Sequence, residues 1–125
     1  MNVFIERLEL PIDAEWDRFI TPLQRSCLEQ VPAGEGWQEG KILIWGVQIR
    51  QELAGAVDVK CGVLISKIIK SLNTKGIQSL LLSVISITFA APKVAKLFGP
   101  ILLEHVLEFA SDHAFSGVHI GCPKK

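Results

Sequence analysis

The amino-acid sequence predicts an α+β fold in which helices flank a mixed, mostly antiparallel sheet. Two observations lead to this class. Stretches rich in valine, isoleucine and leucine, each of a length suited to a strand, occur at residues 2–10, 42–49, 53–59, 63–72 and 117–120. Apolar residues recur at every third or fourth position in residues 13–31 and 100–113, as on one face of a helix. The chain has 125 residues, so we expect residues 1–125 to form one domain.

The composition excludes two classes of protein. The chain carries 13 Lys+Arg and 13 Asp+Glu residues, and its isoelectric point is about 6.8. A chain without net charge has no long-range field that would attract a polyanion, so we expect no nucleic-acid partner. With 49% hydrophobic residues and a mean hydropathy of +0.35, the chain can bury enough apolar surface to fold, which excludes intrinsic disorder.

The cysteines indicate a reducing compartment and no metal site. Cys27, Cys61 and Cys122 are odd in number and widely spaced, which favours free thiols and a cytoplasmic location. His113 and His119 lie close to Cys122 in the sequence, but their spacing matches no ligand pattern for zinc. We therefore expect no bound metal.

Two segments bear on targeting and on membrane association. Glu6, Arg7 and Glu9 interrupt the apolar stretch at the N-terminus, so we expect no secretion signal. The longest uncharged run, Gly76–Pro92, contains several serines and is shorter than the roughly 20 apolar residues that a membrane span needs. We interpret this run as a buried helix and expect no membrane association.

The first third of the chain predicts a strand followed by two short helices. Residues 2–10 mix β-branched and aromatic side chains, as strands do. Asp13 is suited to cap a helix over residues 13–20, because its carboxylate accepts hydrogen bonds from the free N–H groups of the first turn. Thr21 is also a capping residue, and the proline after it fits the first helical position, so a second helix is expected to end near residue 31.

The middle of the chain predicts a loop and then a hairpin. Residues 32–40 contain three glycines and a proline, which favour an irregular loop, and Trp37 within it is expected to fold back over the core. Period-two alternation of apolar residues in 42–49 predicts a strand. The polar residues Arg50–Glu52 are expected to form the turn into a second strand at 53–59.

The last half of the chain predicts one more strand, two helices and a terminal strand. Residues 63–72 favour a strand, although the spacing of their isoleucines also suits a helix. We expect a helix over 76–90, a short strand at Val94–Phe98, and a last helix that begins at Pro100. Gly117–Ile120 reads as a short closing strand.

Two local motifs resemble the GNAT superfamily of acyl-CoA-dependent N-acetyltransferases. In that family the turn between the second and third strands often reads like dGelvG, and Gln51-Glu52-Leu53-Ala54-Gly55 is similar. The family's cofactor motif is a basic residue, Gly-x-Gly, and a helix that opens with two leucines. Lys75–Leu81 resembles this motif, with Gln78 in place of the second glycine. The resemblance, which is degenerate and covers residues 40–120, implies a three-layer, acyl-CoA N-acyltransferase-like version of the fold.

The resemblance also implies which residues bind the acyl donor. A helix N-terminus offers unpaired N–H groups and the positive end of a dipole, both of which suit a pyrophosphate. Gly76, Gln78 and Ser79 would supply such N–H groups, and Lys75 adds a cation. We therefore expect these four residues to bind acetyl-CoA or another acyl-CoA.

A second alignment places the cofactor motif later in the chain. Lys96–Leu103, with Gly99 before Pro100, also resembles the cofactor helix of the family. Under this alignment the last third of the family's domain is missing, and Pro100 lacks an N–H that the pyrophosphate needs. We prefer Gly76 to Gly99 as the marker of the cofactor loop, because the first alignment accounts for nearly every element of the family's order.

The catalytic residues that the family uses are not evident in this sequence. Many members protonate the leaving thiolate with a tyrosine, and this chain has no tyrosine. Asp58 is the strand carboxylate placed to deprotonate an amine, and His105 and Ser111 are candidates for donating a proton to the thiolate. The sequence leaves open whether the chain transfers an acyl group to an amine or only binds the acyl-CoA.

The alternative interpretation is a non-catalytic α+β module that recognises a protein partner or assembles with itself. The missing catalytic residues, the high apolar content and the absence of net charge favour it. The chain is also shorter than a complete GNAT domain. We therefore expect the terminal strand either to be missing or to be supplied by another subunit of a homo-oligomer.

Overall fold

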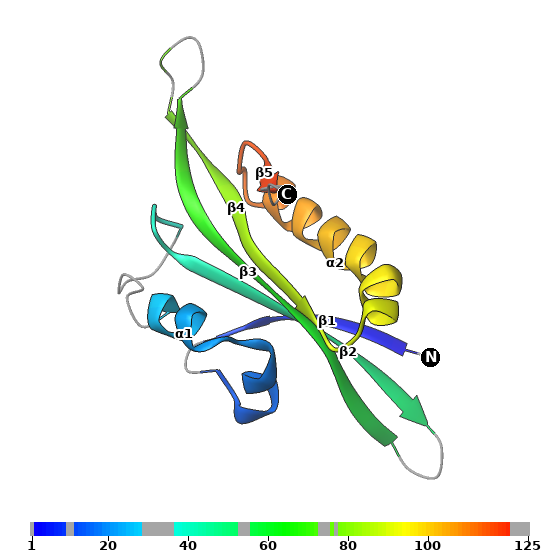
Figure 1. The fold of residues 1–125 in the computed structure, drawn as a ribbon. Helices are drawn as coiled ribbons and strands as arrows, with labels where there is room; N and C mark the ends of the chain where they lie inside the picture. The colour runs from blue at the N-terminus through cyan, green and yellow to red at the C-terminus, as the bar shows by residue number, and fades with distance from the viewer. Residues whose placement is uncertain are drawn as a thin grey trace.

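The computed structural model describes residues 2–9, 12–28, 37–52, 56–72, 76 and 78–120. The strands are β1 (Asn2–Leu8), β2 (Ile42–Glu52), β3 (Ala56–Leu72), β4 (Gln78–Phe89) and β5 (Val118–Ile120). The helical segments are the 3-10 helix η1 (Ala14–Phe19) and the α-helices α1 (Pro22–Leu28) and α2 (Pro92–Asp112). Figure 1 shows long, curved β3 and β4 crossing the molecule, with α2 beside them.

The five strands form one sheet in the order β1-β2-β3-β4-β5. The first four strands pair antiparallel with their neighbours, and β5 pairs parallel with β4. The parallel pair is joined through α2, which crosses from the end of β4 to the start of β5. This architecture confirms the predicted α+β class and the predicted mixed, mostly antiparallel sheet.

Two bulges interrupt the sheet. In the β2–β3 ladder, Val47 pairs with Gly62 and Gln48 pairs with Lys60, so Cys61 is the extra residue. A second shift in the β3–β4 ladder leaves Ile85 as the extra residue. The prediction of two separate strands at 53–59 and 63–72 was wrong, because β3 runs through the first bulge without ending.

The predicted helix over 76–90 was also wrong, because these residues form the end of a hairpin connection and β4. Val84, Ile87 and Thr88 are β-branched residues that pack well in a pleated sheet. Gly76 lies in the β3–β4 connection with φ of +76°, a conformation that suits glycine.

The predicted strand at Val94–Phe98 was wrong as well. These residues belong to α2, which begins at Pro92 and continues past Pro100. A proline inside a helix removes the hydrogen bond to the carbonyl four residues earlier, here that of Lys96. Pro100 is exposed, which leaves that carbonyl on the side of α2 that faces water.

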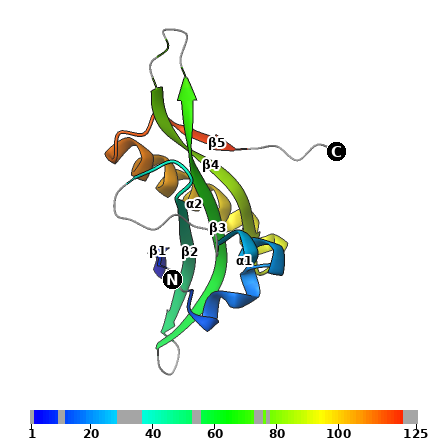
Figure 2. The ribbon, with the colours of Figure 1, turned by 90° about the vertical axis from the view of Figure 1, so that its left-hand side faces the viewer.

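Apolar residues pack on both faces of the sheet. On one face, α2 buries a row of residues at every fourth position against β2, β3 and β4; the row is Phe98, Leu102, Val106 and Ala110. On the other face, η1 and α1 cover the sheet with Trp16, Phe19, Ile20 and Leu28. Figure 2 shows α2 and α1 on opposite sides of the strands.

Two local predictions were confirmed. Thr21 caps α1 through a reciprocal pair of hydrogen bonds, in which the Gln24 N–H donates to Thr21 Oγ1 at 3.2 Å and the Thr21 N–H donates to Gln24 Oε1 at 2.9 Å. Trp37 folds back over the core and meets Phe109 edge to face, with ring centroids 5.5 Å apart. Of the helices in the described part of the chain, none is both long and apolar enough to cross a membrane.

Candidate functional site

The junction between β4 and α2 is where this topology would place a ligand. Only Ala90 and Ala91 separate the end of β4 from the start of α2. Because β4 and β5 are parallel, their carboxyl ends point toward the same edge of the sheet, and ligands of such strands bind outside that edge. β5 pairs with β4 along its whole described length, from Leu82 to Val84.

The start of α2 favours an anion. Ala91 is the N-cap residue and provides no capping side chain, and the first turn contains no acidic residue. The first helical hydrogen bond is donated by the Ala95 N–H to the Ala91 carbonyl at 3.1 Å, so the N–H groups of Lys93 and Val94 precede it. These N–H groups and the positive end of the helix dipole attract negative charge.

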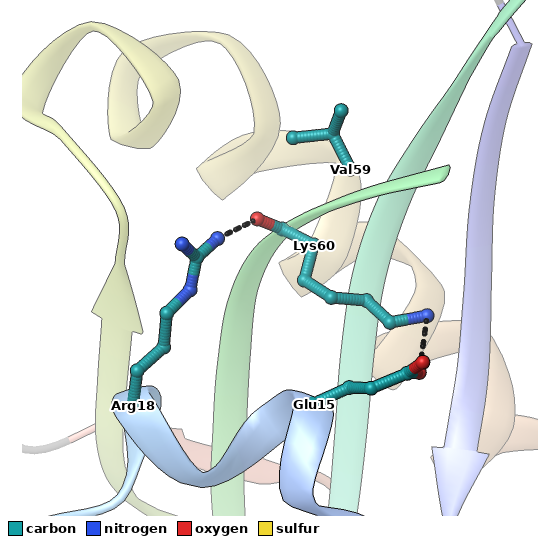
Figure 3. A pocket seen from close by; sticks show the side chains of 4 residues that line it. All are labelled: Glu15, Arg18, Val59 and Lys60. Carbon is teal, nitrogen blue, oxygen red and sulfur yellow. Dashed lines mark hydrogen bonds and ion pairs between the residues drawn. The ribbon is translucent and has the colours of Figure 1, made fainter. Parts of the chain in front are cut away.

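A shallow depression of about 450 Å³ lies near this junction and is lined by Glu15, Arg18, Val59 and Lys60 (Figure 3). The side chains of η1 and β3 meet across it. The Arg18 guanidinium donates a hydrogen bond to the Lys60 carbonyl at 2.7 Å, and Lys60 Nζ lies 3.4 Å from Glu15 Oε2. With two cations and one carboxylate, the depression carries positive charge.

Lys60 is held firmly in the depression. Its Nζ donates to Gln48 Oε1 and lies 4.8 Å from the centroid of the Trp16 ring, and its side chain is 16% exposed. A lysine ordered by these contacts loses little further entropy when an anion approaches it.

The bulge at Cys61 brings the depression and the start of α2 together. The Lys60 carbonyl accepts a hydrogen bond from Arg18, and the next carbonyl, that of Cys61, accepts one from the Ala90 N–H at 2.9 Å. Two consecutive peptides of β3 therefore anchor η1 on one side and the β4–α2 junction on the other. We call Arg18, Lys60 and the N-terminus of α2, which these two peptides of β3 connect, the cationic edge.

Cys61 itself is unsuited to act as a nucleophile. Its thiol is buried, and Sγ lies 3.5 Å from the Val59 carbonyl oxygen. Burial raises the pKa of the thiol, while a backbone hydrogen bond with Ile49 and the charge of Arg18 lower it in part. The thiol is therefore neutral at neutral pH, and a neutral thiol is a poor nucleophile.

The residues expected to bind the acyl donor are not at a helix N-terminus. Gly76 lies in the β3–β4 connection and Ser79 lies near the start of β4, whereas Lys75 and the side chain of Gln78 are outside the described residues. β4 has 12 residues, so its start is about 40 Å from the start of α2. The dipole and free N–H groups on which that expectation rested are therefore absent at Gly76.

Gly99, the marker of the second alignment, lies inside α2. A Cβ at this position would meet the Phe89 ring at 3.9 Å, so the glycine packs beside the end of β4. The start of the helix lies two turns earlier, at Pro92.

The three candidate catalytic residues are spread over the molecule. Asp58 pairs with Arg50 in the β2–β3 ladder, and its side chain lies outside the described residues. His105 and Ser111 are on α2, which has 21 residues, so they lie about 20 Å and 28 Å from its start. The structure does not bring His105 or Ser111 to the cationic edge.

Sequence reasoning missed the residues of the cationic edge. Arg18 and Lys60 are far apart in the chain, and no local pattern links them. Pro92 does carry a signal for the start of α2, because proline is favoured at the first position of a helix. In the described part of the chain, no group of three or more His, Cys, Asp or Glu residues is placed to hold a metal ion.

Comparisons of the chain with known protein families, curated proteins and solved structures give no match.

Proposed function

We propose that this chain binds an acyl-CoA in the manner of a GNAT-like domain, with the phosphates at the cationic edge. The observation that carries the proposal is the β4–α2–β5 unit, in which a helix with an uncapped, acid-free N-terminus connects two parallel strands. The order of the elements supports the resemblance: it is one strand, two helical segments, three strands, a helix and a strand. The presence of helical segments on both faces of the sheet supports it as well.

The charge distribution supports a phosphorylated ligand in particular. The N–H groups at the start of α2 suit a pyrophosphate, and Lys93 is exposed beside them. Arg18 and Lys60 supply further positive charge for a third phosphate.

Calorimetric titration with CoA, acetyl-CoA and pantetheine tests the proposal. We expect both nucleotides to bind, and pantetheine, which lacks the phosphates, to bind at least tenfold more weakly. The resemblance also implies transfer of the acyl group to an amine, which forms an amide and releases the CoA thiol. Thiol release from acetyl-CoA in the presence of amines measures that step separately.

A pair of variants at Ala91 locates the binding site. Ala91→Asp and Ala91→Asn both supply a capping side chain to α2, and a cap stabilises a helix by about 0.5–2 kcal/mol. Only the aspartate places a negative charge where the phosphates would lie. We expect both variants to raise the melting temperature, and only Ala91→Asp to lose CoA binding. Equal affinities for the two variants would contradict a phosphate site at this helix.

A further inference from the structure

The side of α2 that faces away from the sheet carries a stripe of four residues, Lys93, Leu97, Ile101 and Glu104, which we call the outer stripe. Their spacing of three or four positions places them on one face of the helix. Leu97 is 63% exposed and Ile101 is 43% exposed, although both are large apolar side chains. The buried row of α2, which includes Phe98 and Leu102, lies on the opposite side of the helix.

The charged side chains of α2 are placed opposite to the arrangement that its dipole favours. Lys93 is near the N-terminus, where the dipole is positive, whereas Glu104, Glu108 and Asp112 are in the C-terminal half, where it is negative. The first turn has no acidic residue and the last turn has no basic one. Such an arrangement is unfavourable within a single helix. It becomes favourable when a second helix runs alongside in the opposite direction.

We propose that the outer stripe binds the same stripe of a second copy of this chain, with the two α2 helices antiparallel. Leu97 and Ile101 lie at equal separations on either side of Gly99, and Lys93 and Glu104 lie at nearly equal separations from it. A twofold axis near Gly99 therefore places Leu97 against Ile101 of the second copy and Lys93 against Glu104 of the second copy. Each contact occurs twice, as in any isologous interface.

Along the outer stripe, a cation is followed by two apolar residues and then by an acid. This order is complementary to itself when two helices run antiparallel, which favours a second copy of the chain over other partners. A membrane surface would require cations along the polar flank of the helix, whereas Glu104, Glu108 and Asp112 are exposed acids. The absence of net charge on the chain leaves no overall repulsion between copies. One helix face buries a small area, so the dimer is expected to be weak.

Sedimentation equilibrium of the full chain measures this association. For a small interface we expect the average mass to rise from monomer toward dimer between about 10 µM and 1 mM. Lys93→Glu places two acids opposite each other, and Glu104→Lys places two lysines opposite each other. Each variant alone is expected to stay monomeric over the same range.

Complementation gives the sharper result. An equimolar mixture of Lys93→Glu and Glu104→Lys chains restores opposite charges across the axis, and we expect it to form a heterodimer. The double variant is likewise expected to regain the wild-type association. Asp112→Lys is the matched control, because it makes the same charge change as Glu104→Lys about 12 Å further along the helix. Circular dichroism checks that every variant is folded.

A wild-type chain that stays monomeric to 1 mM would overturn the proposal. So would single variants that associate as wild type does, or a mixture of the two variants that remains monomeric. These measurements contain no CoA, so their outcome is independent of acyl-CoA binding.

Discussion

Gly46 in β2 lies directly beneath the Trp16 ring. A Cβ at this position would lie 2.5, 2.7 and 2.9 Å from three ring carbons of Trp16, closer than carbon atoms approach without a shift. We expect Gly46→Ala to lower the free energy of unfolding by about 1–3 kcal/mol, because the ring is buried and has little space to move. Urea denaturation measures the change.

Gly117→Ala is the control for this substitution. A Cβ there would have no neighbour within 4 Å, so a change within about 0.5 kcal/mol is expected. If Gly46→Ala had an effect as small as the control, Trp16 would not be packed as described.

At the same scale, individual residues explain why the candidate site was only partly predictable. The sequence identified Thr21 as a cap from its residue type and the proline after it, whereas the cap predicted at Asp13 was wrong, because its side chain makes no capping hydrogen bond. It did not identify Arg18 and Lys60 as neighbours, because their contact depends on the packing of η1 against β3 across a bulge. A local pattern cannot encode a contact between residues 42 positions apart.

Among the secondary-structure elements, α1 depends on Gln24 for two connections. Gln24 completes the cap of α1, and its Nε2 donates to Ser86 Oγ at 2.7 Å, which ties α1 to β4. We expect Gln24→Ala to cost about 1–2 kcal/mol of stability, since a cap and a partly buried hydrogen bond are both lost.

Leu23→Ala is the matched control, because Leu23 is on the same helix and is 77% exposed. Chemical denaturation of both variants measures the difference. A loss for Leu23→Ala as large as that for Gln24→Ala would show that helix propensity, and not the contacts of Gln24, sets the stability of α1.

The assignments that failed at this scale were those of β4 and the start of α2. β4 has α2 on one face and, through Gln24, α1 near the other, so its sequence lacks the alternation of a half-exposed strand. A mainly apolar stretch of that kind, interrupted by single serines and a threonine, suits a buried strand or a buried helix equally. β1 and β2 were predicted within a few residues of their observed positions, although Arg50–Glu52, which were expected to form the turn, belong to β2.

For the molecule as a whole, positive and negative charges balance but are not evenly placed. The cationic edge gathers Arg18, Lys60 and the start of α2 at one end of the sheet. If phosphates bind there, raising NaCl from about 50 mM to 500 mM should weaken CoA binding severalfold, because salt screens charges at an exposed site. Calorimetry at the two salt concentrations measures this change in affinity. If the affinity for CoA were the same at both concentrations, the result would contradict phosphate binding at the cationic edge.

The mixed sheet and the α+β class were predictable although the number and the order of the predicted elements were partly wrong, because most strands and helical segments have recognisable local patterns. The parallel pairing of β5 with β4 was not specified by any residue pattern. It follows from α2, which carries the chain back along the sheet before β5 begins. The edge at which we propose the ligand to bind is thus a property of chain connectivity.

The connectivity also bears on how the chain folds. β2, β3 and β4 follow one another in the sequence with at most five residues between them, whereas η1, α1 and residues 29–41 separate β1 from β2. Closing a long loop costs more entropy than closing a hairpin. We therefore expect the three-stranded meander to form first, and β1 to join the sheet later, together with the layer that covers Trp16.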